Sequence, residues 1–189
     1  MVARRTREKH GANLFNNAFN TSVFSGGDSL ALCSTAHTFK GTDTTVGNSG
    51  TTALSATALE ATRLLGMQLT DETDNLMDVM YDTLLVPPNL EETANVIVKS
   101  NLKSGEANND MNWNKNRYRV LVWNRLTDSN NWFLIDSKYM KLFLKWFDRV
   151  PVEFNKDKDF DTYISKWSVY TRYSYGFSDW RWLYGHNVS

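Results

Sequence analysis

Residues 82–100, DTLLVPPNLEETANVIVKS, constrain the fold most, because strand chemistry changes to helix chemistry at one point within them. Thr83–Val86 is a short apolar run of the length that a buried strand needs. The two prolines that follow end it, since proline cannot donate to a β-ladder but fits the first turn of a helix. Glu91 and Glu92 then fall in that turn, where the helix dipole favours carboxylates. Apolar residues recur at helical spacing from there on: Leu90, Ala94, Ile97 and Val98. A strand followed by a helix that packs back onto it predicts an α+β domain.

At 189 residues the chain can bury a substantial core, as one domain or two small ones. Its 21 basic and 21 acidic residues cancel, so no overall field draws it to nucleic acid or to anionic lipid. The single cysteine, Cys33, excludes an internal disulfide framework and is typical of a reducing compartment. No apolar run approaches the roughly 18 residues of a membrane span, and the charged start leads into no apolar export segment. We therefore expect a soluble protein that is made in the cytosol.

Residues 5–20 predict a helix whose apolar stripe consists of Leu14, Phe15, Ala18 and Phe19. The basic residues near its start oppose the helix dipole, which indicates a helix that continues upstream. They fit a solvated helix face better than a phosphate site. Residues 21–52 are rich in Gly, Ser and Thr and predict turns around one short strand at residues 30–33.

Cys33 and His37 stand four residues apart and raise two chemical alternatives. A zinc site needs three or four ligands, and no second pair accompanies these two. A Cys/His catalytic dyad is defined by geometry that the sequence does not show. His10 and His186 are isolated and fit surface or hydrogen-bonded structural positions.

A second helix begins after Ser55, a good N-cap, and Leu54 with Leu59 fit the hydrophobic staple that fixes chain entry. The spacing predicts that its buried face consists of Ala58, Ala61, Leu65 and Leu69. Residues 101–116 are rich in Asn and without periodicity, and they predict an exposed loop.

The C-terminal part predicts several strands. Residues 117–123 and 131–136 pair most simply as a hairpin. Residues 139–147 predict another extended run, which Pro151 and the charge cluster NKDKD interrupt. Residues 163–175 alternate most cleanly, and predict a long strand with an aromatic face and a polar face. The aromatic face carries Tyr163, Trp167, Val169, Thr171, Tyr173 and Tyr175.

Trp180, Trp182 and Tyr184 share one face of the stretch that follows, with Asp179 and Arg181 opposite. Such an aromatic row can stack on sugars or bases, although packing in a core or a subunit interface is the commoner use. A binding module for carbohydrate or single-stranded nucleic acid is therefore an alternative, and it requires that the three rings are exposed. No Gly-rich phosphate loop, nucleophile elbow or HExxH motif is present, so we do not expect an enzyme.

Blocks of this sequence resemble, in order, the tailed-phage major capsid proteins of the Mu-like major head subunit type. The longest block is YSYGFSDWRWLYGHN at residues 173–187. The others are TRE at 6–8, NNAF at 16–19, GD at 27–28, LCSTAH at 32–37, LLVPPNLEETA at 84–94 and WFLID at 132–136. The resemblance covers nearly the whole chain.

This resemblance implies the Hong Kong 97-type capsid fold. Residues 1–52 would be the first part of a peripheral domain, with the end of its long spine helix at residues 5–20. Residues 53–136 would be the axial domain, with Thr83–Val86 in its central sheet, and residues 137–189 would return to the peripheral domain as long strands. Proteins of this type carry an N-terminal arm and an extended loop before the spine helix, so we expect that the chain lacks that portion.

The resemblance also implies a structural role, as a head subunit of a tailed bacteriophage or prophage that assembles in the host cytoplasm into the shell around the genome. The expected partner is the chain itself, in pentamers and hexamers of an icosahedral virion capsid, together with scaffold, portal and decoration proteins. We expect only weak, non-specific contact with packaged DNA, no membrane association, no cofactor and no metal. Each subunit interface must exceed roughly 1,000 Å² to be specific. The expected interface residues are Asn108, Asn109, Trp113, Lys141, Phe143, Lys145, Trp167, Tyr173, Trp180, Arg181 and Trp182.

Overall fold

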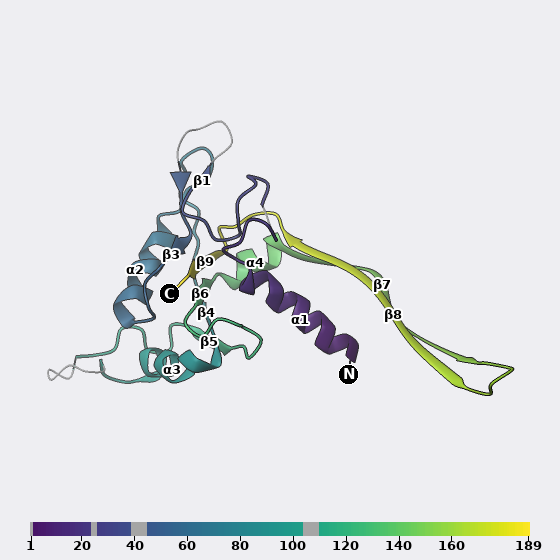
Figure 1. Cartoon of the computed structure of the whole chain (residues 1–189). Helices are drawn as coiled ribbons and strands as arrows, with labels where there is room; N and C mark the ends of the chain where they lie inside the picture. The colour runs from purple at the N-terminus through teal and green to yellow at the C-terminus, as the bar shows by residue number, and fades with distance from the viewer. Residues whose placement is uncertain (1, 24–25, 39–44, 104–109) are drawn as a thin grey trace.

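A computed structural model of the chain describes residues 2–23, 26–38, 45–103 and 110–189. The described part is a mixed α+β structure (Figure 1). Its elements in chain order are α1 (Val2–Asn16), β1 (His37–Thr38), β2 (Thr45–Val46), β3 (Ser49–Gly50), α2 (Ala56–Met67), β4 (Thr83–Val86), the 3₁₀ turn η1 (Pro88–Leu90), α3 (Glu91–Lys99), β5 (Arg119–Val122), β6 (Trp132–Ile135), α4 (Ser137–Phe143), β7 (Leu144–Lys158), β8 (Ser165–Phe177) and β9 (Leu183–His186).

The core forms around a five-stranded sheet with the order β3-β9-β6-β4-β5. The pairs β4–β5 and β3–β9 are parallel, whereas β4–β6 and β6–β9 are antiparallel. Every residue of β4, β6 and β9 is buried, because helices cover both faces of the sheet's centre. β1 and β2 form a separate two-stranded sheet.

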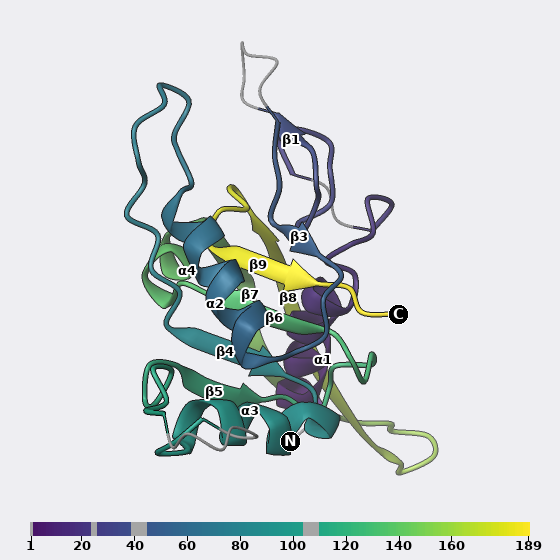
Figure 2. The ribbon, with the colours of Figure 1, turned by 90° about the vertical axis from the view of Figure 1, so that its left-hand side faces the viewer.

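The helices α2 and α3 lie on one face of this sheet and α1 lies on the other (Figure 2). On the α2 side, the hydroxyl of Thr62 lies 2.9 Å from Nε2 of His186 in β9. On the α1 side, the rings of Phe15 and Phe133 meet edge to face with their centroids 5.7 Å apart. The first helix ends at Asn16, earlier than the predicted residue 20. Leu14 and Phe15 are buried on its core side as expected, whereas Ala18 and Phe19 pack into or against the core from the turn that follows.

The strands β7 and β8 form a long antiparallel two-stranded sheet that projects away from the body, and we call it the ribbon (Figure 1). α1 lies along its base. Arg7 of α1 forms an ion pair with Asp148 of β7 at 2.7 Å, and the hydroxyl of Tyr173 in β8 lies 2.9 Å from Nδ1 of His10. The N-terminal helix and the ribbon therefore pack against each other beside the central sheet.

The sequence predicts the strand-to-helix change in residues 82–100 correctly. β4 is buried throughout, η1 follows the prolines, and Glu91 and Glu92 occupy the first turn of α3. Ser55 is confirmed as the N-cap of α2, because its Oγ accepts a hydrogen bond from the backbone N–H of Ala58 at 3.1 Å. The strand predicted at residues 163–175 is confirmed as β8.

The predicted hairpin of residues 117–123 with 131–136 is wrong. Both strands exist, but β4 lies between them, parallel to β5 and antiparallel to β6. β6, WFLI, is apolar on both faces and belongs at the centre of the sheet, whereas β5 exposes alternate residues and fits the edge. If the two strands were neighbours in a hairpin, either β6 would be exposed at the edge of the sheet or β5 would be buried at its centre.

The extended run predicted at residues 139–147 is wrong in its first half, which forms α4. Asp136 caps this helix, since its Oδ1 accepts hydrogen bonds from the N–H groups of Lys138 and Tyr139 at 2.9 and 3.0 Å. Pro151 does not interrupt the following strand either. It lies at a register shift between Val150 and Glu153, where a residue without an N–H costs no ladder hydrogen bond.

Two further expectations are corrected. Residues 30–33 form bends rather than a strand, because their backbone groups bond elsewhere: the N–H of Cys33 donates to the carbonyl of Ala18 at 2.7 Å. The buried face of α2 consists of Ala58, Leu59, Thr62 and Gly66, while Ala61 and Leu65 are exposed. The helix presents Gly66 to the core because the ring of Tyr81 packs there and leaves no room for a side chain.

Candidate assembly surfaces

The outer half of the ribbon exposes large aromatic side chains. Phe154, Phe160, Tyr163 and Trp167 are 76%, 87%, 71% and 72% exposed. A two-stranded sheet is marginally stable at best without a second layer, and its free edges offer unpaired N–H and C=O groups. Exposed apolar surface of this kind is typical of a surface that another protein covers.

The base of the ribbon has one covered face and one open face. The ring of Trp146 stacks on Tyr173 and Tyr175, with centroid distances of 4.7 and 5.0 Å, and this face meets α1. Side chains alternate along a strand, so Phe147 points to the opposite face, where it is largely exposed. In the outer half, Phe154 pairs with Val169 and Lys156 with Trp167, so Phe154 and Trp167 lie on the same face as Tyr173 but beyond α1. This face is therefore covered by α1 at the base and exposed in the outer half.

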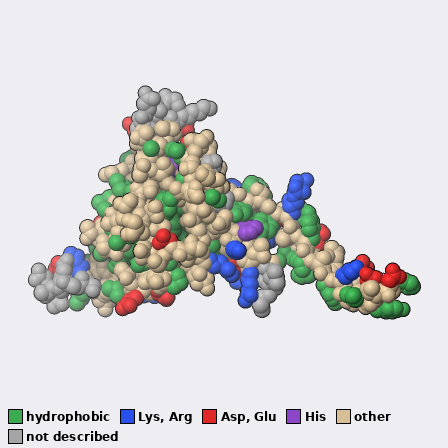
Figure 3. All heavy atoms as spheres, viewed as in Figure 1, with side chains coloured by type: hydrophobic (Ala, Val, Ile, Leu, Met, Phe, Trp, Pro, Cys, Tyr) green, Lys and Arg blue, Asp and Glu red, His purple; other side chains and the backbone are tan. Residues whose placement is uncertain are grey.

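Charged side chains in the outer half are paired locally. The ammonium groups of Lys156 and Lys158 lie 4.8 and 4.3 Å from the ring centroids of Trp167 and Tyr163. Lys166 forms an ion pair with Asp159 at 2.8 Å, and this hydrogen bond is the main reason why the pKa of Asp159 is lowered. These contacts fix the positions of the aromatic rings while leaving them accessible (Figure 3).

A second apolar surface lies between α2 and the segment around Trp113. Leu64 on the outer side of α2 and Trp113 are both exposed, and the groove between them has a volume of about 490 Å³. The guanidinium of Arg117 lies 5.4 Å from the centroid of the Trp113 ring. The side-chain amide of Asn112 donates to the carbonyl of Ile97 at 2.7 Å, which anchors this segment to the end of α3.

The aromatic row at the C-terminal end faces inward. Trp180, Trp182 and Tyr184 are buried, and Trp182 donates its indole N–H to the carbonyl of Asp179 at 2.8 Å. These three rings form no open platform for a sugar or a base, so the alternative of an aromatic binding module built on them is wrong. The physical reason is that β9 lies inside the central sheet, where both faces are covered.

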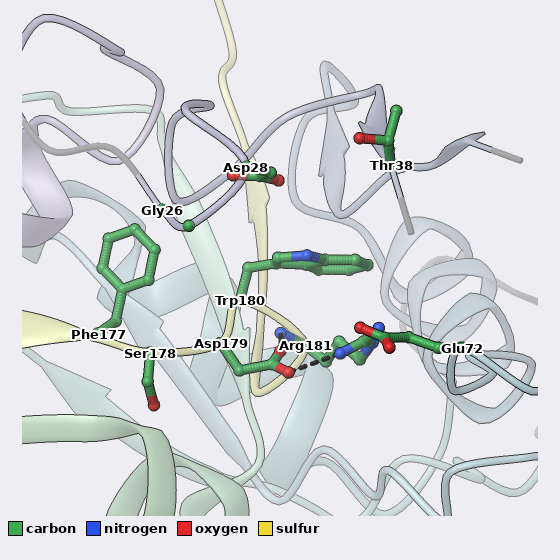
Figure 4. Close-up of a pocket in the computed structure, with 10 residues that line it drawn as sticks. Gly26, Asp28, Thr38, Glu72, Phe177, Ser178, Asp179, Trp180 and Arg181 are labelled. Atoms are coloured by element: carbon green, nitrogen blue, oxygen red, sulfur yellow. Dashed lines mark hydrogen bonds and ion pairs between the residues drawn. The ribbon is translucent and has the colours of Figure 1, made fainter. Parts of the chain in front are cut away.

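A polar pocket of about 540 Å³ lies beside Trp180 (Figure 4). Asp28 and Thr38 lie on one side of the indole ring, and Arg181 lies on the other. Arg181 forms an ion pair with Asp179 at 2.6 Å. Carboxylates and a guanidinium that neutralise each other are typical of a structural network rather than of a reactive site.

The structure places the predicted interface residues in different environments. Trp113, Lys141, Lys145 and Trp167 are exposed. Phe143, Tyr173 and Arg181 are partly covered, whereas Trp180 and Trp182 are buried within the chain. Asn108 and Asn109 lie outside the described residues. The sequence pattern did not single out Phe147, which ends the extended run predicted at residues 139–147. It also did not indicate Phe154 and Phe160, which fall where Pro151 and the charge cluster were expected to break the strand.

Cys33 and His37 do not form a reactive pair. Burial raises the pKa of the Cys33 thiol, and the two ring nitrogens of His37 face Asp28 and Asn48 instead. Within the described ranges, no group of three His, Cys, Asp or Glu side chains is arranged to hold a metal ion. The same part of the chain contains no helix with the length and apolar character needed to span a bilayer.

Comparison with models of protein families identifies the family of this chain. A family model described as phage capsid protein matches residues 1–185, which is nearly the full length. No curated protein matches the sequence. Capsid proteins are structural and assemble with copies of themselves, which agrees with apolar surfaces that the fold leaves open and with the inward-facing Trp row. The chain belongs to the phage capsid protein family.

Proposed function

We propose that this capsid protein is a major head subunit of the Mu-like type with the Hong Kong 97-type fold, and that copies of it form an icosahedral shell. The ribbon is the observation that carries the proposal. It projects from the body and exposes aromatic side chains along its outer half, where no other part of the described chain forms a second layer. A neighbouring subunit is the simplest source of that layer.

The dimensions of the ribbon support this role. β8 contains 13 residues, so the ribbon is roughly 45 Å long, which is enough to reach across a neighbouring subunit. A strip of this length with an open aromatic face can contribute a large part of the roughly 1,000 Å² that a specific interface needs. Its edges can also pair with a strand of another copy.

The domain division of the Hong Kong 97-type fold is part of the proposal. Residues 53–136 would form the axial domain, and residues 1–52 and 137–189 would form the peripheral domain. The contact between α1 and the ribbon supports a shared peripheral lobe. β3 and β9 come from the flanking parts yet pair in the central sheet, so the two lobes would be joined by hydrogen-bonded strands rather than by a free linker.

We place the contacts around the five-fold and six-fold axes at residues 101–116 and the groove beside Trp113. The exposed rings and aliphatic side chains there support this placement. Asn108 and Asn109 belong to the same proposed contact. In the peripheral domain the proposed interface residues are Lys141, Phe143, Lys145, Trp167 and Tyr173, and we add Phe147 and Phe154. The burial of Trp180 and Trp182 argues against direct contact with a neighbour, so this interface omits them together with the adjacent Arg181.

The remaining partners follow from the shell role and are proposed with it: scaffold, portal and decoration proteins, with weak and non-specific contact to packaged DNA. The balance of 21 basic and 21 acidic residues supports a container that encloses DNA without binding it tightly.

The test is light scattering after size exclusion, combined with electron microscopy, on the purified chain over a range of concentrations. We expect rings or shells that grow with concentration, and maps in which each ribbon lies on a neighbouring subunit. The variant Phe154→Asp should prevent assembly, because it places a charge on the exposed aromatic surface of the outer half of the ribbon. Thr93→Asp, at an exposed polar position of α3 outside the ribbon, is the matched control and should assemble normally. A chain that stays monomeric at several hundred micromolar, or assembly that is equal in the two variants, would overturn the proposal.

A further inference from the structure

Two buried histidines each stack on a tryptophan. His37 lies 4.2 Å from Trp180 with an interplanar angle of 7°, and His186 lies 4.0 Å from Trp132 with an angle of 5°. Both imidazoles are almost completely buried. The hydrogen-bond partners of the two rings differ, and they determine how many ring nitrogens carry a hydrogen in each histidine.

The partners of His186 fix a neutral ring. The backbone N–H of Thr52 points at Nδ1 at 3.3 Å, so Nδ1 is an acceptor. The hydroxyl of Thr62 donates its single hydrogen to the carbonyl of Ala58 at 2.7 Å, so it accepts from Nε2–H at 2.9 Å. One acceptor and one donor nitrogen make the uncharged tautomer. Burial agrees with this arrangement, since it lowers the pKa of His186 to about 4.

The partner of Nε2 in His37 is an oxygen that can only accept. The amide nitrogen of Asn48 donates to the carbonyls of Leu32 and Leu183 at 2.8 and 2.9 Å, which fixes the orientation of the amide. Oδ1 of Asn48 therefore faces His37 at 3.1 Å, and it also accepts from the N–H of Ser34 at 2.9 Å. Nε2 of His37 must carry a hydrogen.

The partner of Nδ1 in His37 is a carboxylate. Oδ2 of Asp28 lies 2.5 Å from Nδ1, and Oδ1 of Asp28 accepts from the N–H of Leu30 at 3.1 Å. Burial acts to raise the pKa of Asp28, but the hydrogen bonds from His37 and Leu30 outweigh it and lower that pKa overall. A carboxylate in this position needs an N–H on Nδ1 as well. Because an acceptor faces each ring nitrogen of His37, both nitrogens carry a hydrogen. The His37–Asp28 pair therefore holds one proton more than a neutral imidazole beside a carboxylate would.

The other charged groups around His37 are arranged to tolerate this charge. The far side of the Trp180 ring meets the guanidinium of Arg181, 5.2 Å from its centroid, and Arg181 is itself paired with Asp179 (Figure 4). The indole thus lies between two cationic groups, which pair with Asp28 and Asp179. Glu72 lines the same pocket on the Arg181 side of the ring (Figure 4). Asn48 contributes only a neutral oxygen from the turn between β2 and β3.

We propose that Asp28 and His37 form a buried imidazolium–carboxylate pair that acts as a pH-sensitive latch. It joins the segment after α1, the β1–β2 sheet and the connection between β8 and β9, where Trp180 lies. Loss of the proton to solvent base would leave the lone pair of Nδ1 facing the carboxylate, which is a buried and unsatisfied contact. The Trp180 stack would then open and loosen the base of the ribbon. This inference concerns a single chain and does not depend on the proposed shell.

Solid-state NMR of the full chain with ¹⁵N-labelled histidine tests the protonation directly, whether or not copies assemble. At pH 7.5 we expect two ring N–H groups for His37 and a single N–H, on Nε2, for His186. The variants His37→Gln and His186→Gln assign the two sets of signals. A neutral His37 ring at this pH, with one nitrogen lacking a hydrogen, would overturn the proposal.

Hydrogen exchange tests the latch. Opening releases one proton above the ordinary pKa of histidine, about 6.5. Protection of residues 178–186, corrected for intrinsic rates, should therefore fall roughly sixteenfold from pH 6.5 to 8, with a slope that approaches tenfold per pH unit at the upper end. Asp28→Asn keeps the side-chain shape but removes the negative charge that holds the proton, and its protection should vary much less with pH. Thr38→Asn, an exposed neighbour, is the control and should keep the full slope. Equal slopes in wild type and Asp28→Asn, with both folded by circular dichroism, would refute the latch.

Discussion

Two tryptophans of this chain allow a matched test of which aromatic residues hold the subunit together and which hold copies together. Trp182 is fully buried, and its ring meets Phe15 of α1 at 6.2 Å. Trp167 lies on the ribbon and is largely exposed, with Lys156 over its ring. The same change, tryptophan to alanine, should therefore have opposite consequences at the two positions.

The expected magnitudes follow from burial. Trp182→Ala removes a complete indole from the core and the donor to the carbonyl of Asp179, so it should cost about 3–5 kcal/mol of the free energy of unfolding. With a denaturant slope of about 2 kcal/mol per molar urea, the midpoint should fall by about 2 M. Trp167→Ala removes little buried area and should change the free energy of unfolding by less than about 0.5 kcal/mol.

Assembly should show the reverse order. If Trp167 is an anchor of the subunit interface, its loss should cost about 2 kcal/mol per contact, or roughly a thirtyfold weaker association. The assay pairs urea unfolding by circular dichroism, at a concentration where the chain is monomeric, with light scattering at increasing concentration. A loss of monomer stability in Trp167→Ala as large as that in Trp182→Ala would refute the assignment of the ribbon as an open surface. Unchanged assembly of Trp167→Ala would refute its role as an anchor.

Three further predictions concern the body of the subunit. The pKa of His186 is about 4 in the folded chain and about 6.5 in the unfolded chain, so only the unfolded chain binds a proton between these pH values. The free energy of unfolding should therefore fall by about 3 kcal/mol from pH 6.5 to 4. The same titration of His186→Gln separates the contribution of this histidine from that of the carboxylates. Gly66→Ala should lower the free energy of unfolding in urea by about 1–3 kcal/mol, because a Cβ there overlaps the Tyr81 ring. Gly27→Ala is the control and should change stability little, because a Cβ there meets open space. Equal effects of the two variants would contradict the packing argument. Asp136→Ala should cost about 1–2 kcal/mol, since it removes the cap of α4, and full retention of stability would show that the cap is dispensable.

The parts of the fold that the sequence predicts correctly are those that local chemistry decides. The prolines after β4, the N-cap Ser55 and the alternation in β8 each act on neighbouring residues. The hairpin error has another origin, because the neighbour of a strand depends on which strands can be buried on both faces. α4 was missed because apolar residues alternate with others along residues 139–147, as in a strand, and this alternation outweighed the capping signal of Asp136.

The candidate surface was predictable only in part, for a related reason. Alternation identified Trp167 and Tyr173 as one face of a strand, but it does not say what covers that face. α1 covers Tyr173, and nothing in the described chain covers Trp167. The row at Trp180 and Trp182 has the same composition as the ribbon, and the central sheet buries it.

The aromatic side chains therefore fall into two groups, those that the chain covers with its own helices and those that it leaves exposed. Trp132 and Trp182 lie on strands or turns that the chain covers with its own helices, so they contribute to folding. Trp167 and Phe154 lie on a sheet that has two strands and no helix above its outer half, so they cannot contribute much until another molecule arrives. A capsid subunit that buried all of its aromatic residues internally would fold more stably, but it would keep no apolar surface for its neighbours. In the proposed shell, the exposed ribbon would lower the stability of the monomer and make contact between copies favourable.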